Sequence, residues 1–341
     1  MVIDFWGKIK QQTLASLYLL YGTETFLLNE TLERIVGTAL KDGERDFHLS
    51  VYDCEETPIE AAIEEAETLP FFGEKKVVVV KNPYFLTAEK GKDKVEHDLK
   101  KLEEYIASPS PFAVVIFVGL YEKLDERKKI TKRLMNEAEV FVASPLHEKE
   151  LHRWIGERVK ENGVTITEEA KDALLKLAGT NLMILANELD KLALFVGQAG
   201  TIAKETVEML VSRTLEQNVF VLVEKVVQRN ISEALQIFYD LLESNEEPIK
   251  ILSLLASQFR LLYQVKWLAA KGYGQQQIAS LLKVHPFRVK LALGQSVLFS
   301  EQELLKMMHD LAEADYQMKS SAMDKRLLIE LLFVKWSQER M

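Results

Sequence analysis

Short runs of β-branched and aromatic residues alternate with segments of helical period through the first 143 residues. The runs span residues 17–21, 47–53, 77–80, 113–118 and 140–142. Between them, apolar residues recur at helical spacing along 28–39, 59–66 and 99–106. Strands that alternate with helices in this way form a parallel sheet with helices on its faces. We therefore predict an α/β domain over residues 1–143.

The pattern changes after the Ser-Pro step at residues 144–145, beyond which no strand is recognisable. Thr167, followed by two glutamates, is typical of a residue that caps the start of a helix, and so is Asn181 ahead of a leucine-rich stripe. We predict a small helical domain over residues 144–212 and a second all-α domain over residues 213–341.

The last domain is predicted to be a set of helices. They cover residues 219–227, 231–242, 248–270, 275–282, 287–294, 301–316 and 324–338. The helix that begins at Pro248 is apolar on more than one face, whereas a helix on the outside of a bundle needs a single apolar stripe. The excess favours burial inside a larger assembly, and a central position in an ordinary bundle is the alternative.

The composition bounds the class of protein. A chain of 341 residues suits two or three domains, and 48% hydrophobic with 28% charged residues is typical of globular proteins. Its apolar runs fall short of the roughly 20 residues that a membrane helix needs, and we find no secretion signal, so a cytoplasmic location is expected. The single cysteine, Cys54, has no thiol partner for a disulfide or a zinc site.

The charge is distributed unevenly. The formal net charge is −9, which argues against general coating of nucleic acid, yet residues 248–300 contain no Asp or Glu. The candidate contacts to DNA or to another subunit in this basic stretch are Arg260, Lys266, Lys283, Arg288 and Lys290.

The first predicted strand runs into a glycine and then a helix, an arrangement that can bind phosphate. The residues do not support that chemistry, because Leu27 and Leu28 stand where glycine and lysine would be needed, and Glu24 would repel phosphate. Asp53 follows a strand, but an isolated Asp there is more often a turn residue. We predict the architecture of a nucleotide-binding domain without its chemistry, and no cofactor.

Other catalytic and metal-binding patterns are missing from the sequence. The six histidines lack the spacing of a zinc-binding helix, and no serine lies in a G-x-S-x-G turn. We therefore assign no catalytic residue and no metal ligand.

Two adjacent aromatic residues, Phe71 and Phe72, stand between Pro70 and Gly73 ahead of a predicted strand. Proline and glycine predict a turn, and two neighbouring rings in a turn do not easily both face inward. At least one ring is expected to meet a partner, where such an anchor commonly contributes about 2 kcal/mol or more. The alternative is that both rings close the edge of the domain's own core.

Several stretches, in this order and spacing, resemble the delta subunits of bacterial DNA polymerase III clamp loaders. They are residues 19–28, 68–76, 177–182, 187–192, 254–262, 282–290 and 311–316. In that family the loop before the third strand carries an apolar and aromatic pair that enters a pocket of the sliding clamp. The resemblance places Phe71 and Phe72 in that role, with Leu69 beside them.

The resemblance implies a non-catalytic subunit with an AAA+-like first domain, a small helical lid and a helical collar. Its expected partners are the sliding clamp (beta), the delta prime and tau/gamma subunits of a hetero-pentamer, and primed DNA through the complex. The subunit would open the clamp ring during DNA replication, while sister subunits bind and hydrolyse ATP.

Two rival interpretations remain. Residues 275–290 imitate a helix-turn-helix in basic surroundings, which favours a DNA-binding regulator, although Pro286 falls at the start of the recognition helix. The second rival is an active ATPase with an aberrant phosphate loop.

Overall fold

The structure is a computed structural model that describes residues 2–11, 14–41, 43–88, 95–228 and 230–338. The chain forms two compact units, Met1–Pro145 and Leu146–Met341. The first is α/β and the second is mostly helical, which confirms the predicted fold class. Among the described residues, no helix has the length and apolar character needed to cross a membrane.

The first unit is built on a parallel sheet with the strand order β2-β3-β4-β1-β5. Its strands are β1 (Leu17–Gly22), β2 (Leu49–Asp53), β3 (Lys76–Lys81), β4 (Ala113–Gly119) and β5 (Glu139–Ala143). Strands β3 and β4 are buried along nearly their whole length, because apolar side chains point to both faces, whereas the edge strand β2 is half-buried. All the predicted strands are present.

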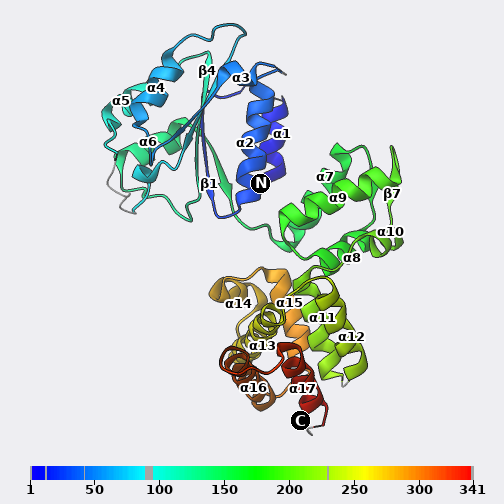
Figure 1. Ribbon diagram of the computed structural model, residues 1–341. Helices are drawn as coiled ribbons and strands as arrows, with labels where there is room; N and C mark the ends of the chain where they lie inside the picture. The colour runs from blue at the N-terminus through cyan, green and yellow to red at the C-terminus, as the bar shows by residue number, and fades with distance from the viewer. Residues whose placement is uncertain (1, 12–13, 42, 89–94, 229, 339–341) are drawn as a thin grey trace. The chain divides into compact units, whose positions relative to one another are not determined.

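Helices cover both faces of this sheet. They are α1 (Val2–Gln11), α2 (Thr25–Ala39), α3 (Arg45–His48), α4 (Ile59–Glu67), the 3₁₀ turn η1 (Tyr84–Leu86), α5 (Leu99–Ala107) and α6 (Lys129–Glu137). Figure 1 shows α1 and α2 on one face and α4, α5 and α6 on the other. The sequence predicted a strand from residue 47, but β2 begins at Leu49, because the preceding residues form the single turn α3.

The second unit begins with a small group of helices and one short strand pair. Its elements are α7 (Glu148–Glu161), β6 (Thr165–Ile166), α8 (Glu168–Ala178), α9 (Leu182–Val196), β7 (Thr201–Ile202) and α10 (Lys204–Leu210). The predicted caps are confirmed: the Thr167 hydroxyl accepts the N–H of Ala170, and the Asn181 side chain accepts two N–H groups of α9. The parallel pair β6 and β7 was not predicted, because two residues are too few to show a period.

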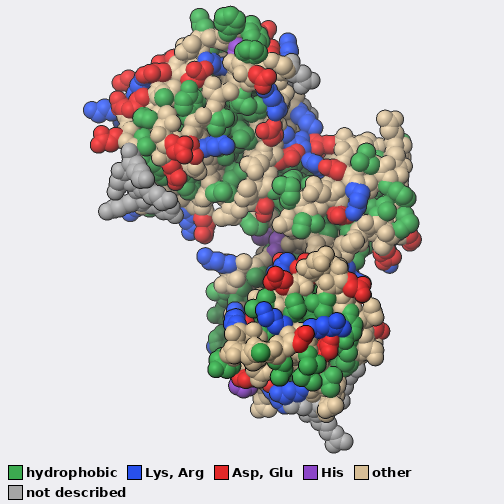
Figure 2. Space-filling view, in the orientation of Figure 1, with side chains coloured by type: hydrophobic (Ala, Val, Ile, Leu, Met, Phe, Trp, Pro, Cys, Tyr) green, Lys and Arg blue, Asp and Glu red, His purple; other side chains and the backbone are tan. Residues whose placement is uncertain are grey.

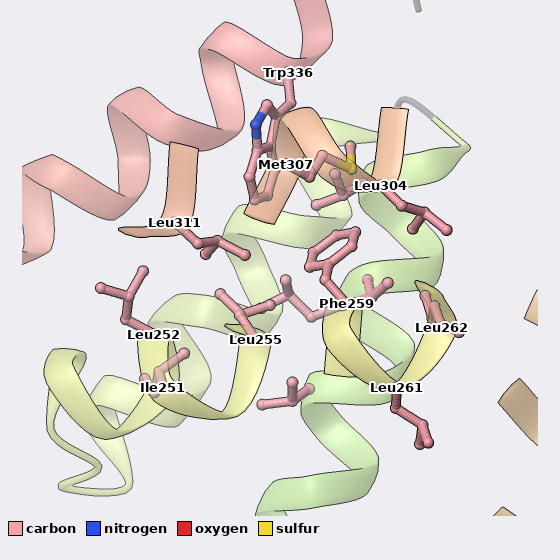
Figure 3. Packing of buried hydrophobic residues seen from close by; sticks show 14 of the residues in the cluster. Ile251, Leu252, Leu255, Phe259, Leu261, Leu262, Leu304, Met307, Leu311 and Trp336 are labelled. Atoms are coloured by element: carbon pink, nitrogen blue, oxygen red, sulfur yellow. The ribbon is translucent and has the colours of Figure 1, made fainter. Parts of the chain in front are cut away.

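The remaining helices form a bundle. They are α11 (Leu215–Val227), α12 (Ile231–Glu243), α13 (Pro248–Ala270), α14 (Gln275–Leu282), α15 (Pro286–Ser296), α16 (Glu301–Ser320) and α17 (Lys325–Gln338). Helix α13 packs against α11, α14, α15, α16 and α17, so it is the central helix. Figure 3 shows its Phe259 beside Trp336 and Met307, with the two aromatic ring centroids 5.4 Å apart.

The central position of α13 accounts for its broad apolar surface. Its apolar side chains from Ile251 to Leu268, with the exception of Trp267, pack within the bundle, which is the alternative that the sequence left open. The excess of apolar residues on α13 is therefore no evidence of a larger assembly.

Candidate functional site

The loop between α4 and β3, residues 68–75, exposes large apolar side chains. Phe71 is 93% exposed, Leu69 71% and Phe72 41%, so the rings are not sealed inside the core of this unit. The loop lies at the edge of the sheet that is formed by the amino ends of the parallel strands. Helix α3 precedes the neighbouring strand β2 at the same edge. Figure 2 shows hydrophobic side chains gathered at the end of the first unit where Figure 1 labels α3.

The two ends of this loop are joined by a buried lysine. Lys76 is 3% exposed, and its Nζ donates to the carbonyl oxygen of Thr68 at 3.1 Å. The same Nζ lies 2.5 Å from Oε1 of Glu65 on α4. One ammonium group thus connects the start of the loop, its end and the helix that leads into it. We call this connection the closed base of the loop, because it fixes the two ends between which the loop tip projects.

Gly73 makes the turn that follows the aromatic pair. Its φ is +76°, a conformation that L side chains rarely adopt, and a Cβ there would lie 3.1 Å from Oε1 of Glu44. The loop therefore passes close to the chain segment that leads into α3.

The two adjacent phenylalanines differ in their surroundings. The Phe72 ring packs edge-on against His48 and Phe47 of α3, with centroid distances of 4.4 and 5.3 Å. Phe71 lies outside it, 6.2 Å from Phe72. Phe72 is thus the supported base of the aromatic group and Phe71 its tip.

The opposite edge of the sheet is formed by the carboxyl ends of the strands. In nucleotide-binding folds, the loop at this edge that follows the first strand binds phosphate. Here the backbone N–H groups of Thr23 and Glu24 both donate to the carbonyl oxygen of Ala143, at 2.9 and 3.0 Å. Gly22 has φ +147°, and a Cβ on it would lie 2.1 Å from the same oxygen. The donors that would otherwise face a phosphate are therefore occupied by β5.

The side chains of Glu24 and of the first turn of α2 are equally unsuited to phosphate. Leu27 and Leu28 are buried in the core. Burial raises the pKa of the Glu24 carboxyl, an effect that a hydrogen bond from the Phe26 N–H opposes. An acidic group at this position repels an anion, and no lysine stands on the first turn of α2 to attract one.

Asp53 is the turn residue that the sequence suggested. Its carboxylate accepts the backbone N–H of Glu55 at 2.9 Å and the side-chain amide of Asn82 at 2.9 Å. Within the described ranges, no group of three His, Cys, Asp or Glu side chains could hold a metal ion.

The basic candidates in the second unit are spread over three helices. Arg260 and Lys266 lie on α13, Lys283 ends α14, and Arg288 and Lys290 lie on α15. Lys266 donates to the carbonyl oxygen of Ser296 at 3.2 Å, and Lys290 pairs with Glu148 of α7 at 2.7 Å. Those two cations thus bind other parts of the chain, although Lys290 is itself exposed, as are Arg260 and Lys283.

The sequence reasoning missed an exposed aromatic residue on α13. Trp267 is partly exposed, and Nζ of Lys271 lies 3.5 Å from its ring centroid. Arg260 is seven positions before Trp267, which places both on one face of the helix. A tryptophan four residues before a lysine in an acid-free stretch was the signal that could have found them.

The start of α15, the recognition helix of the helix-turn-helix interpretation, is occupied within the unit. Pro286, Phe287 and Val289 are buried, and the His285 ring is hydrogen-bonded to the carbonyl oxygen of Leu146. A recognition helix reads bases with its N-terminal residues. The helix-turn-helix alternative therefore finds no support.

The fold and this site define a class: an AAA+-like protein whose phosphate loop is closed by its own backbone and whose apolar loop stands at the other edge of the sheet. Three protein-family models match successive parts of the chain. The family model described as DNA polymerase III, delta subunit matches residues 18–144, the model for the C-terminal domain of the same family matches 216–336, and a model described as a middle domain matches 147–209.

Known proteins are similar to this chain in sequence and structure, two of them along nearly its whole length. The DNA polymerase III subunit delta of Bacillus subtilis (strain 168) is 50% identical over 335 residues, 98% of this chain and 96% of that protein. The probable DNA polymerase III subunit delta of Aquifex aeolicus (strain VF5) is 25% identical over 256 residues, 75% of this chain and 72% of that one. The solved Bacillus subtilis DNA clamp loader delta protein superimposes with a TM-score of 0.80 at 49% identity, covering 99% of this chain and 100% of that one.

The chain belongs to the DNA polymerase III delta subunit family. The resemblance found in the sequence is thereby confirmed, together with a role in the clamp loader and in DNA replication.

Proposed function

We propose that this chain binds the sliding clamp through Leu69, Phe71 and Phe72 and opens it, without ATPase activity of its own. The observation that carries the proposal is the exposure of Phe71, 93%, on a loop with a fixed base. A ring exposed to water contributes no hydrophobic free energy to folding. Its burial in an apolar pocket of a partner would contribute favourable free energy to binding. Family membership supplies the clamp as that partner.

The mechanism follows from preorganisation. Burial of a phenylalanine side chain contributes about 1.5–3 kcal/mol, and little of it is lost to ordering when the loop is already held by Lys76 and Gly73. We propose that the free energy of inserting two or three such side chains into one pocket is used to strain a clamp interface. We propose that the ring opens at the interface strained in this way.

ATP is then bound and hydrolysed by sister subunits. The occupied donors of Thr23 and Glu24 support this division of labour. The expected assembly is a hetero-pentamer with delta prime and tau/gamma, which meets primed DNA in the cytoplasm.

We further propose that residues 144–212 act as the lid and residues 213–341 as the collar that joins the assembly. Helix α17 supports a collar contact, because Leu327, Leu331 and Val334 form an exposed apolar stripe at positions i, i+4 and i+7.

Clamp affinity tests the site. Phe71→Ala is expected to weaken binding of the purified chain to the purified clamp by about 2 kcal/mol, roughly 30-fold, and Phe72→Ala by a comparable amount. Leu120→Ala is a matched control, since Leu120 is an exposed apolar residue that follows β4 at the opposite edge of the sheet. Undiminished affinity in the Phe71→Ala, Phe72→Ala double variant would remove the site and leave the fold unaffected.

A further inference from the structure

A third exposed phenylalanine stands beside the loop 68–75 and comes from a different part of the chain. Phe47 lies on α3 and is 68% exposed, and its ring centroid is 5.3 Å from that of Phe72. The two are neighbours because α3 precedes β2 and the loop precedes β3, and these two strands are paired in parallel from Leu49 and Val77 onward. The aromatic surface therefore continues from Phe71 through Phe72 to Phe47.

The fold does not need Phe47 in order to form α3. The turn is closed by the N–H of His48, which donates to the carbonyl oxygen of Glu44 at 2.9 Å, and it is anchored by the buried His48 ring. Arg45 ties the turn to α2 through an ion pair with Glu33 at 2.9 Å. With the turn held by its neighbours, Phe47 extends outward and keeps most of its surface in water.

Single exposed apolar residues are common on protein surfaces and need no explanation. Phe47 differs from them in being continuous with two other exposed rings, on a backbone segment that is locally fixed. Interface anchors cluster in this way near the centre of a contact surface.

We propose that Phe47 is a direct contact of the sliding clamp, so that two chain segments, α3 and the loop 68–75, form one binding surface. This inference rests on the proposed clamp-binding function. Phe71 and Phe72 enter the clamp pocket, and Phe47 covers its rim on the side of β2. The surface is wider than the loop alone, which restricts the orientation in which the clamp can bind.

Protection of an introduced thiol tests this directly. The natural Cys54 is buried, and burial together with the neighbouring Asp53 and Glu60 charges raises its pKa to about 12, so it reacts poorly with maleimide. A thiol introduced by Phe47→Cys can therefore be labelled selectively in the full-length chain. We compare its labelling rate with and without clamp, alongside Phe71→Cys and the opposite-edge control Leu120→Cys.

The clamp is expected to slow labelling at positions 47 and 71 by about tenfold or more and to leave position 120 unchanged. Protection at 71 with none at 47 would overturn the inference while the proposed function stands. Absence of protection at both positions, under conditions where the clamp is bound, would overturn both.

A mutant cycle separates direct contact from support of Phe72. Phe47→Ala is expected to weaken clamp binding about tenfold, and to do so in the Phe72→Leu background as well. A loss that disappears in that background would show that Phe47 acts only by holding the Phe72 ring, and the direct contact would be refuted. The midpoint of thermal unfolding should stay close to that of the parent, because Phe47 is mostly exposed.

Discussion

Lys76 shows what a single residue can do that its sequence position does not reveal. A lysine next to an apolar strand usually marks the exposed flank of that strand, and nothing in the pattern distinguishes Lys76 from Lys81 at the other end of β3. The structure buries Lys76 and directs its Nζ to Thr68 and Glu65. Phe71 and Phe72, by contrast, could be found from the sequence, because proline and glycine beside them predict a turn.

Replacement of this lysine should loosen the loop. Lys76→Met keeps the buried stem but removes the ammonium donor from the Thr68 carbonyl and from the Glu65 carboxylate, which keeps a 3.5 Å hydrogen bond from the Ser50 hydroxyl. We expect a loss of about 2 kcal/mol in the free energy of unfolding, less than the ~3–5 kcal/mol of a fully buried pair, because Glu65 is partly exposed.

Urea denaturation measures this loss, and clamp titration measures the consequence for binding. Clamp affinity should fall although Leu69, Phe71 and Phe72 are all present, since the loop must then be ordered during binding. Lys81→Met, at the exposed end of the same strand, should change neither quantity appreciably. Clamp affinity equal to wild type in Lys76→Met would show that the closed base is not needed.

Among the elements, long periodic segments were predictable and short ones were not. The strands of the sheet are present, with β2 starting two residues later than predicted, and the helices α13 and α14 have the predicted bounds, since each of these helices carries at least two turns of one period. The single turn α3 and the strand pair β6 and β7 are too short to show a period, and tertiary contacts decide them. Missing α3 also hid Phe47, which the sequence pattern assigned to a strand.

Helix α13 also carries an exposed face with Arg260 and Trp267, which Lys271 extends directly after the end of the helix. A cationic and aromatic stripe of this kind suits nucleic acid, because cations bind phosphates and an indole ring stacks on bases. We propose that this face meets DNA in the assembled loader. Lys266 and Lys290, with partners inside the chain, contribute less.

Charge reversal on that face should weaken DNA binding in a salt-dependent manner. For the double variant Arg260→Glu, Lys271→Glu, the slope of log affinity against log salt should fall by about 2, because two phosphate contacts are lost. Fluorescence anisotropy on primed DNA with the reconstituted loader measures it. Lys176→Glu with Lys204→Glu, exposed charges on α8 and α10, serves as the control. An unchanged slope in an intact assembly would assign the face to a protein neighbour.

Over its whole length, the chain combines an α/β unit with the architecture of a nucleotide-binding domain and a helical unit built around α13. The first unit uses the two edges of one sheet differently: the phosphate loop is closed by Ala143 at one, and the aromatic loop projects at the other. Sequence reasoning identified the family, because the matching stretches extend from the first strand to α16. It could not show that backbone donors of Thr23 and Glu24 are occupied, since that depends on where β5 ends.

We propose that the chain opens the clamp by inserting apolar side chains, with no nucleotide. The most direct test is the lifetime of clamps on nicked circular DNA, which they leave only when the ring opens. Purified full-length chain, added without ATP, should shorten that lifetime severalfold or more, and the Phe71→Ala, Phe72→Ala double variant should leave it unchanged. A wild-type chain that binds the clamp without shortening its lifetime, or a double variant as effective as wild type, would show that these side chains do not open the ring.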